Sequence, residues 1–106
     1  MVHHINDTNA AELLNHNPHP ILLDFYADWC NPCQRLAPTI EDLAAEYGER
    51  AVIVKCNVEE APETATYFGV RSIPTILFIK DSVIEATEVG AQPKSVLKAN
   101  LDRLLR

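Results

Sequence analysis

Hydrophobic residues occur along this chain in short continuous runs, separated by stretches in which they recur every three or four positions. A continuous apolar run bounded by turn residues predicts a strand that is covered on both faces. Two runs are separated only by Asp81 and Ser82, so they predict an antiparallel hairpin, although the glycine that favours such a turn is missing. The predicted strands are residues 21–27, 51–58, 75–80 and 83–89.

The stretches outside these strands have helical spacing. The longest one starts at Cys33 and ends near Gly48, which is a candidate C-cap. In the segment of residues 6–17, Asn and Asp residues stand in capping positions ahead of a short apolar stripe. The predicted helices are residues 6–17, 33–48, 61–69 and 94–106. This order of strands and helices predicts an α/β fold with a strand–helix–strand unit.

Size and composition limit the classes of function. A chain of 106 residues predicts one domain, residues 1–106. Hydrophobic residues make up 47%, and no apolar run approaches the ~20 residues that span a bilayer, so we expect a soluble protein. The net charge of −6 offers no basic surface to phosphates, which argues against nucleic acids and membranes as partners. The beginning lacks the pattern of a secretory signal, so we expect a cytoplasmic protein.

Cys30 and Cys33 lie where the first predicted strand meets the longest predicted helix. Zinc usually needs four Cys or His ligands, whereas this chain has three cysteines and its four histidines cluster near its beginning, so we expect no metal. A structural disulfide would close a very short loop and constrain the unfolded chain little. Inert core thiols do not suit the neighbouring Trp29, Asn31 and Pro32, which indicate a surface turn. Thiol–disulfide exchange is therefore the favoured interpretation.

The predicted position of the cysteine pair suits that chemistry. Unpaired backbone N–H groups and the helix dipole stabilise a thiolate at a helix N-terminus, so we expect a lowered pKa for Cys30. Cys33, one turn further into the helix, is expected to be more sheltered and to attack the sulfur of Cys30. Pro32 stiffens the loop between them.

Asp24 interrupts the apolar run of residues 21–27. An ionised carboxylate that is buried without a partner is costly, so we expect its pKa to be raised, and it could then exchange a proton near neutral pH. The alternative is a hydrogen-bonded or hydrated aspartate with a structural role. Perturbed carboxyl groups gather at functional sites, and both interpretations stay open on the residues alone.

Three segments resemble the thioredoxin family in order and spacing across essentially the whole chain: LLDFYADWCNPCQRLAPTIEDLA, VKCNVEEAPETATYFGVRSIPTILFIK and VGA. The resemblance implies a thioredoxin fold, in which four helices flank a central five-stranded mixed sheet. It also implies a protein disulfide reductase that needs no bound cofactor. Such a protein reduces disulfides in client proteins and is recharged by a separate thioredoxin reductase, and we expect it to be a monomer.

The resemblance assigns roles to single residues. Cys30 attacks the client disulfide, Cys33 resolves the mixed disulfide, and Asp24 moves protons to and from Cys33 beside the charged Lys55. Pro74 is implied to be a cis-proline packed against the cysteines, although alone it could be an ordinary proline at a strand start. Lys55 could equally reach solvent from its strand. The implied client-binding residues, which could otherwise be packing and turn residues, are Trp29, Asn31, Pro32, Ile73, Pro74, Gly90 and Ala91.

Within that surface, Ile73 is expected to offer backbone groups to an extended client segment. Asn31 stands where the family usually has glycine, and its side chain could donate to the Cys30 thiolate or compete for the helix N-terminus. Gln34 replaces a common lysine, which removes a positive charge near Cys30 and acts in the opposite direction on its thiolate. Cys56 lies in an apolar strand, where cysteine normally behaves as an inert hydrophobic residue.

Two other functions remain open. A disulfide oxidase or isomerase would use the same kind of motif, but such proteins often have histidine where this chain has Pro32. A thioredoxin-like interaction module would not need a complete set of Cys30, Cys33, Asp24 and Pro74. Cysteine proteases and transferases need a base beside the thiol, and no histidine lies near this motif.

Overall fold

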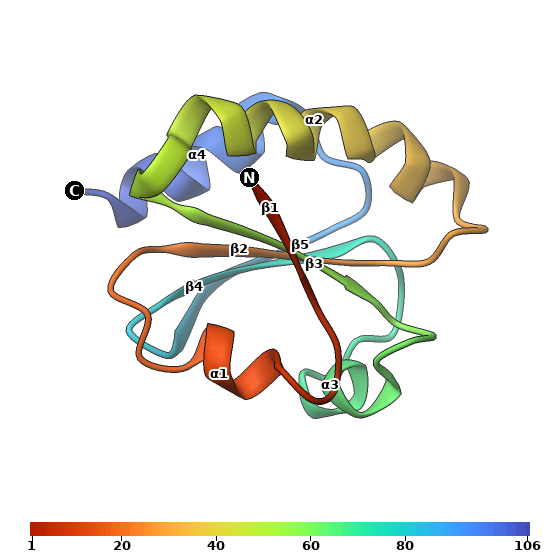
Figure 1. Cartoon of the computed structure of the whole chain (residues 1–106). Coiled ribbons are helices and arrows are strands. Elements are labelled where there is room, and N and C mark those ends of the chain that lie inside the picture. Colours follow the sequence, from red (N-terminus) through yellow and green to blue (C-terminus); the bar gives the residue numbers. More distant parts are fainter.

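The computed structural model describes all 106 residues and contains one five-stranded mixed sheet (Figure 1). The strand order is β1-β3-β2-β4-β5. β3 pairs in parallel with β1 and β2, whereas β4 runs antiparallel to β2 and β5. The elements in chain order are β1 Val2–Ile5, α1 Ala10–Leu14, β2 Ile21–Tyr26, α2 Asn31–Tyr47, the 3₁₀ turn Gly48–Arg50, β3 Val52–Asn57, α3 Pro62–Tyr67, β4 Thr75–Lys80, β5 Val83–Val89 and α4 Lys94–Leu104.

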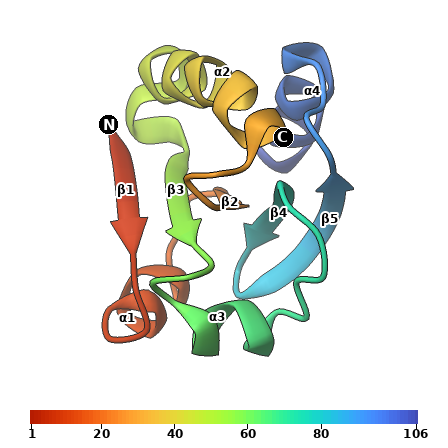
Figure 2. The ribbon, with the colours of Figure 1, turned by 90° about the vertical axis from the view of Figure 1, so that its right-hand side faces the viewer.

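The helices form two layers on opposite faces of the sheet. α2 and α4 cover one face, and α1 and α3 cover the other, as Figure 1 and the turned view in Figure 2 show. Because strand residues alternate between faces, Leu22 of β2 packs with the α2 and α4 cluster, whereas Leu23 and Phe25 pack with the α1 and α3 cluster. β2 is the central strand and is buried on both faces, as its continuous apolar run predicts.

The four predicted strands and the four predicted helices are confirmed, and so is the sheet of five strands with four helices that the resemblance implied. The alternation of apolar residues did not indicate β1. That strand has four residues, two of them histidines, and it lies at the edge of the sheet with only Ile5 fully buried. A short, half-exposed edge strand has too few core-facing positions to show a period.

Of the Asn and Asp residues in capping positions before the first helix, Asn6 caps the turn that leads into α1: its Oδ1 accepts from the backbone N–H of Thr8 and Asn9 at 2.9 and 3.0 Å. α1 covers only Ala10–Leu14, and its N-cap residue Asn9 makes no side-chain capping bond, because the Oδ1 of Asn9 accepts from the Asn6 N–H at 2.7 Å. Asp7 instead caps α3. Its carboxylate accepts from the backbone N–H of Glu63 and Thr64, at 3.2 and 2.8 Å, and from the Thr64 hydroxyl at 2.7 Å. The local sequence reveals a capping residue but not which helix it serves.

The hairpin between β4 and β5 is present, with a two-residue turn that has no glycine. Asp81 and Ser82 both adopt left-handed backbone conformations, with φ of 52° and 64°. This is the turn geometry that matches the twist of paired strands, and glycine or asparagine adopts it most easily. The turn therefore holds two residues in a costly conformation.

None of the α-helices combines the length and the apolar character that a membrane-spanning helix needs.

Candidate functional site: the cysteine pair

Cys30 and Cys33 lie at the junction of β2 and α2 and are joined by a disulfide bond, with their Cα atoms 5.2 Å apart. Cys30 is the N-cap of α2, and its sulfur accepts a hydrogen bond from the Cys33 backbone N–H at 3.2 Å. Pro32 stands in the first turn, where its missing N–H costs nothing because that group has no partner within the helix. The helix starts at Asn31, two residues earlier than predicted, so the sulfur of Cys30 faces the N–H groups at the helix end.

Both cysteines of the pair are buried. The exposed fraction is 4% for Cys30 and 4% for Cys33, so the expectation that Cys33 is the more sheltered one is wrong for the disulfide form. The pair packs with Ala27 in a small cluster that Ile73 and Val58 also contact. A disulfide brings both sulfurs into one contact region, which explains their equal burial.

The segment before β4 meets the disulfide. The Ile73–Pro74 peptide bond is cis, as the resemblance implied, and the Ile73 carbonyl oxygen lies 3.9 Å from the sulfur of Cys30. The Gly90 N–H donates to the Pro74 carbonyl at 2.8 Å, and Gly90 has a φ of 93°, which favours glycine. This bond ties the segment that includes Gly90 and Ala91 to the cis-proline. Residues far apart in the sequence thus converge next to Cys30.

Trp29 and Ile73 share a hollow of about 210 Å³ beside the disulfide. Trp29 is 66% exposed, which is unusual for so large an apolar side chain. The hollow is mostly apolar, as the expected contact surface around Cys30 requires. Sequence reasoning missed the other residues that line this hollow, which are Val58, Ala65, Val70, Arg71 and Ser72. The last three directly precede the Ile73–Pro74 segment.

Asp24 lies in the core with 1% of its surface exposed. It alternates with Leu23 and Phe25 in β2 and therefore points to the face covered by α2, the helix that contains Cys33. Burial raises the pKa of Asp24 to about 6, and its Oδ1 has no hydrogen-bond partner among the protein groups. The expected burial and raised pKa of Asp24 are both confirmed, and the interpretation as a hydrogen-bonded structural aspartate loses support.

Lys55 lies directly opposite Asp24 in the paired strands β3 and β2. Its positive charge lowers the pKa of Asp24, against the larger effect of burial. The ammonium nitrogen sits 4.2 Å from the ring centroid of Tyr26 and forms no ion pair, since both ion pairs of the structure involve Glu46. Tyr26 thus holds Lys55 by a cation–π contact, a link that sequence reasoning did not find.

The departures from the family pattern have different environments. Asn31 is exposed, and its side chain makes no hydrogen bond in the disulfide form. Gln34 donates from Nε2 to the Asp28 carbonyl at 2.6 Å and so fastens the loop that carries Trp29.

Cys56 is fully buried, and burial raises the pKa of its thiol to about 11. The prediction that Cys56 is buried and therefore unreactive at neutral pH agrees with this environment.

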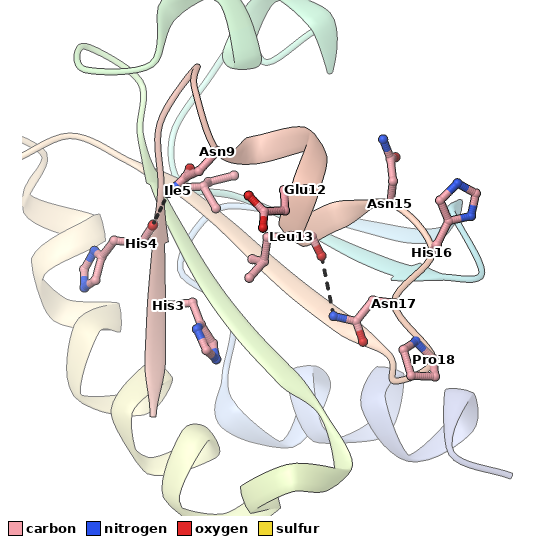
Figure 3. Close-up of a pocket in the computed structure, with 10 residues that line it drawn as sticks. All are labelled: His3, His4, Ile5, Asn9, Glu12, Leu13, Asn15, His16, Asn17 and Pro18. Carbon is pink, nitrogen blue, oxygen red and sulfur yellow. Dashed lines mark hydrogen bonds between the residues drawn. The ribbon is translucent and has the colours of Figure 1, made fainter.

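Another hollow, of about 500 Å³, lies away from the cysteines, beside β1 and α1 (Figure 3). It is mostly polar, and His3, His4 and His16 are among its residues. Figure 3 shows His3 and His4 on opposite sides of β1 and His16 beyond α1, so their rings do not converge. No three side chains of the metal-binding types come together anywhere in the structure.

Residues 1–103 match the family model described as Thioredoxin. A thioredoxin of Haemophilus influenzae is 48% identical over 94 residues, which are 89% of this chain and 88% of that protein. A thioredoxin of Allochromatium vinosum is 41% identical over 99 residues, 93% of this chain and 92% of that protein. A chloroplastic M-type thioredoxin of Pisum sativum is 41% identical over 101 residues, 95% of this chain but 59% of that longer protein.

Family model and relatives therefore agree with a buried, disulfide-bonded CxxC pair that caps a helix. The chain belongs to the thioredoxin family of disulfide oxidoreductases.

Proposed function

We propose that this protein reduces disulfide bonds in client proteins, with Cys30 as the nucleophile and Cys33 as the resolving thiol. The observation that supports it best is the position of the Cys30 sulfur at the N-terminus of α2, where it accepts the Cys33 N–H at 3.2 Å. In the reduced protein, the same N–H group and the helix dipole favour the thiolate of Cys30.

The reaction takes place in two exchanges. The Cys30 thiolate attacks one sulfur of the client disulfide, forms a mixed disulfide and releases the other client sulfur as a thiolate, which takes up a proton. Cys33 then loses its proton and attacks the Cys30 sulfur, which closes the Cys30–Cys33 disulfide and frees the second client thiolate. Two electrons pass from the protein to the client, and a thioredoxin reductase restores the dithiol.

Asp24 is the base that we propose for Cys33. A carboxyl group with a pKa of about 6 is mostly ionised at neutral pH and can accept the Cys33 proton while that thiol attacks. Its position on the α2 face of β2 supports this role. Lys55 modulates the pKa of Asp24 through its charge.

The client would lie over the exposed ring of Trp29 and against the segment of Ile73 and Pro74. The hollow shared by Trp29 and Ile73 accepts an apolar side chain, and the backbone of Ile73 pairs with an extended client segment. We assign Asn31, Pro32, Gly90 and Ala91 to the same client-binding surface, because the first two lie between the cysteines and the Gly90 N–H is bonded to the Pro74 carbonyl. We further propose that the protein acts as a monomer in the cytoplasm, whose reducing poise keeps such dithiols supplied with electrons.

The test is the reduction of insulin disulfides by the purified protein, with dithiothreitol as the electron source. Cys30→Ser is expected to abolish catalysis, and Cys33→Ser to trap a mixed disulfide with the client at Cys30. Cys56→Ser is the matched control, because Cys56 is the third cysteine and is buried away from the pair, so its loss should leave the rate unchanged. Catalysis that survives Cys30→Ser would refute the proposal.

The disulfide oxidase or isomerase alternative predicts the opposite direction of electron flow, from a reduced client to the Cys30–Cys33 disulfide. An interaction module predicts a partner whose binding survives the loss of both cysteines. Neither has a specific observation in its favour here, because Pro32, Asp24 and the cis Pro74 are all present.

A further inference from the structure

A second groove lies on the side of α3 that faces α1, away from the hollow of Trp29. Two adjoining hollows of about 420 and about 300 Å³, both open to solvent, share residues Leu14, Asn15, Tyr67 and Phe68 and form this groove. It runs between α1 and α3 to the start of β5, and Figure 2 shows these three elements at the same end of the molecule. We call it the α1–α3 groove; its apolar residues include Ala11, Leu14, Tyr67, Phe68, Ile79 and Ile84.

Two large apolar residues of this groove are unusually exposed, whereas Leu14 and Ile79 form its buried floor. Tyr67 is 83% exposed and Ile84 is 47% exposed. The ring of Tyr67 meets that of Phe68 edge to face, with the ring centroids 5.0 Å apart, so it is supported at the rim of the groove. Contiguous exposed apolar surface on a globular protein marks an interaction site, since it gains most from being covered.

The charge around the groove is of one sign. Both charged residues that line it, Asp7 and Glu63, are acidic. Asp7 is engaged in capping α3, whereas the side chain of Glu63 is exposed. The segments around it, residues 7–15, 59–70 and 81–84, contain six Asp and Glu residues and no Lys or Arg. The basic residues next to these segments are directed elsewhere, since Lys80 donates to the Leu104 carbonyl of α4 at 2.6 Å and Arg71 lines the hollow of Trp29, so the groove attracts a positively charged partner.

We propose that the α1–α3 groove docks an amphipathic segment of a partner protein that has apolar side chains on one side and flanking Lys or Arg residues. The apolar side chains fill the two hollows, and the basic residues meet Glu63 and the acidic segments around it. The groove and the redox hollow use different sides of α3, because Ala65 lines the hollow of Trp29 whereas Tyr67 lines the groove. A partner docked here leaves the cysteine pair free, and the proposal does not depend on the redox function.

Two short synthetic peptides of identical length and leucine pattern test this, one with lysines and one with glutamates at its polar positions. Each is titrated into the isotope-labelled full chain and followed by NMR chemical shifts. The lysine peptide is expected to shift the signals of α1, α3 and the start of β5 and to bind more weakly as salt is added, since salt screens exposed charges. The glutamate peptide is expected to bind far more weakly.

Two variants locate the contact. Tyr67→Ser should lower the affinity for the lysine peptide by roughly tenfold, as removal of a central aromatic contact does. Glu63→Lys should weaken the lysine peptide and strengthen the glutamate peptide. Val89→Ser is the control, because Val89 is a 56% exposed apolar residue of β5 outside the groove. All three side chains are exposed, so the variants should fold.

Three results would overturn the proposal. Equal binding of both peptides would remove the role of charge, and shifts centred on Trp29 would place the contact on the redox surface. Shifts in the groove that grow with protein concentration in the absence of peptide would assign it to a second copy of this chain.

Discussion

Lys55 and Asp24 lie opposite each other in the paired strands β3 and β2, yet the ammonium group of Lys55 rests on the ring of Tyr26, 4.2 Å from its centroid, and forms no ion pair with the carboxylate. A direct ion pair would hold the pKa of Asp24 low. Because the charge of Lys55 only partly offsets the cost of burial, the pKa of Asp24 stays raised, at about 6. The carboxyl group can therefore both accept and return a proton near neutral pH.

Asp24 should make the stability of the protein fall as the pH rises. Its pKa is raised in the folded protein, from 3.8 to about 6, so the folded state binds the proton more tightly, and this stabilisation is lost between these two pH values. The shift corresponds to about 3 kcal/mol. The free energy of unfolding of Asp24→Asn, measured in urea and compared with that of the wild type, should therefore gain about 3 kcal/mol between about pH 3.5 and about pH 7.5. A constant difference would show that Asp24 titrates normally.

Asp24 should also control the rate of client reduction. With an amide in its place, Cys33 must release its proton to solvent, and we expect Asp24→Asn to slow insulin reduction about tenfold to a hundredfold at neutral pH. In the wild type, the rate should rise with pH through a step near 6, which is the pKa of Asp24. Stopped-flow measurement across this range checks both effects. The same step in the variant would assign it to another group.

Lys55→Met should move the pH-dependent step in the rate of client reduction to higher pH. The charge of Lys55 lowers the pKa of Asp24, so its removal leaves burial unopposed and raises that pKa further. Lys55→Arg keeps the charge and can keep the cation–π contact with Tyr26, so it serves as the control. The pH dependence of insulin reduction is measured for both variants. A step that moves to lower pH in Lys55→Met would contradict the assigned effect of its charge.

Asn31 should make the protein a weaker reductant than a glycine variant. In the disulfide form its side chain has no hydrogen bond, which leaves it free to donate to the Cys30 thiolate once the pair is reduced. A hydrogen bond to a charged group of about 1.5 kcal/mol corresponds to roughly 30 mV for a two-electron couple. The reduction potential of Asn31→Gly should therefore be more negative by about that amount. Indistinguishable potentials of the two proteins would reject this role.

A glycine in the β4–β5 turn should stabilise the folded protein. Asp81 has a φ of 52° and makes no side-chain hydrogen bond. Asp81→Gly should raise the free energy of unfolding by roughly 0.5–1 kcal/mol, because relief of the left-handed conformation exceeds the extra freedom of glycine in the unfolded chain. Ser82→Gly should gain less, since the Ser82 hydroxyl accepts from the His16 N–H at 3.2 Å. Thermal unfolding of both variants compares them, and a loss of stability in Asp81→Gly would be the contrary result.

The buried strands and long helices could be predicted because their burial leaves a strong period in the sequence, as in β2 and α2. β1 could not, since an edge strand with one fully buried residue shows no period. The pairing of Asp7 with α3 was also beyond local reasoning, because it joins residues more than fifty positions apart.

Within the site, the cysteines and Asp24 have distinctive sequence signals, a short spacing and a charge in an apolar run. The contact of Lys55 with Tyr26 and the bond of Gln34 to the Asp28 carbonyl depend on side-chain directions, which the sequence pattern does not contain. The hollow beside Trp29 likewise forms only when α3 and the segment before Pro74 meet. Contacts between elements were thus what the sequence alone could not provide.

The reduction potential of the Cys30–Cys33 pair tests the central claim most directly. The purified protein is equilibrated with a series of thiol–disulfide buffers, and the fraction oxidised is followed by Trp29 fluorescence and by trapping of the thiols. A protein disulfide reductase requires a potential more negative than the cytosolic glutathione poise, which biochemical extraction places at about −220 to −260 mV, and we predict such a value. A potential of about −180 mV or higher would contradict the assignment and identify the protein as a disulfide oxidase or isomerase.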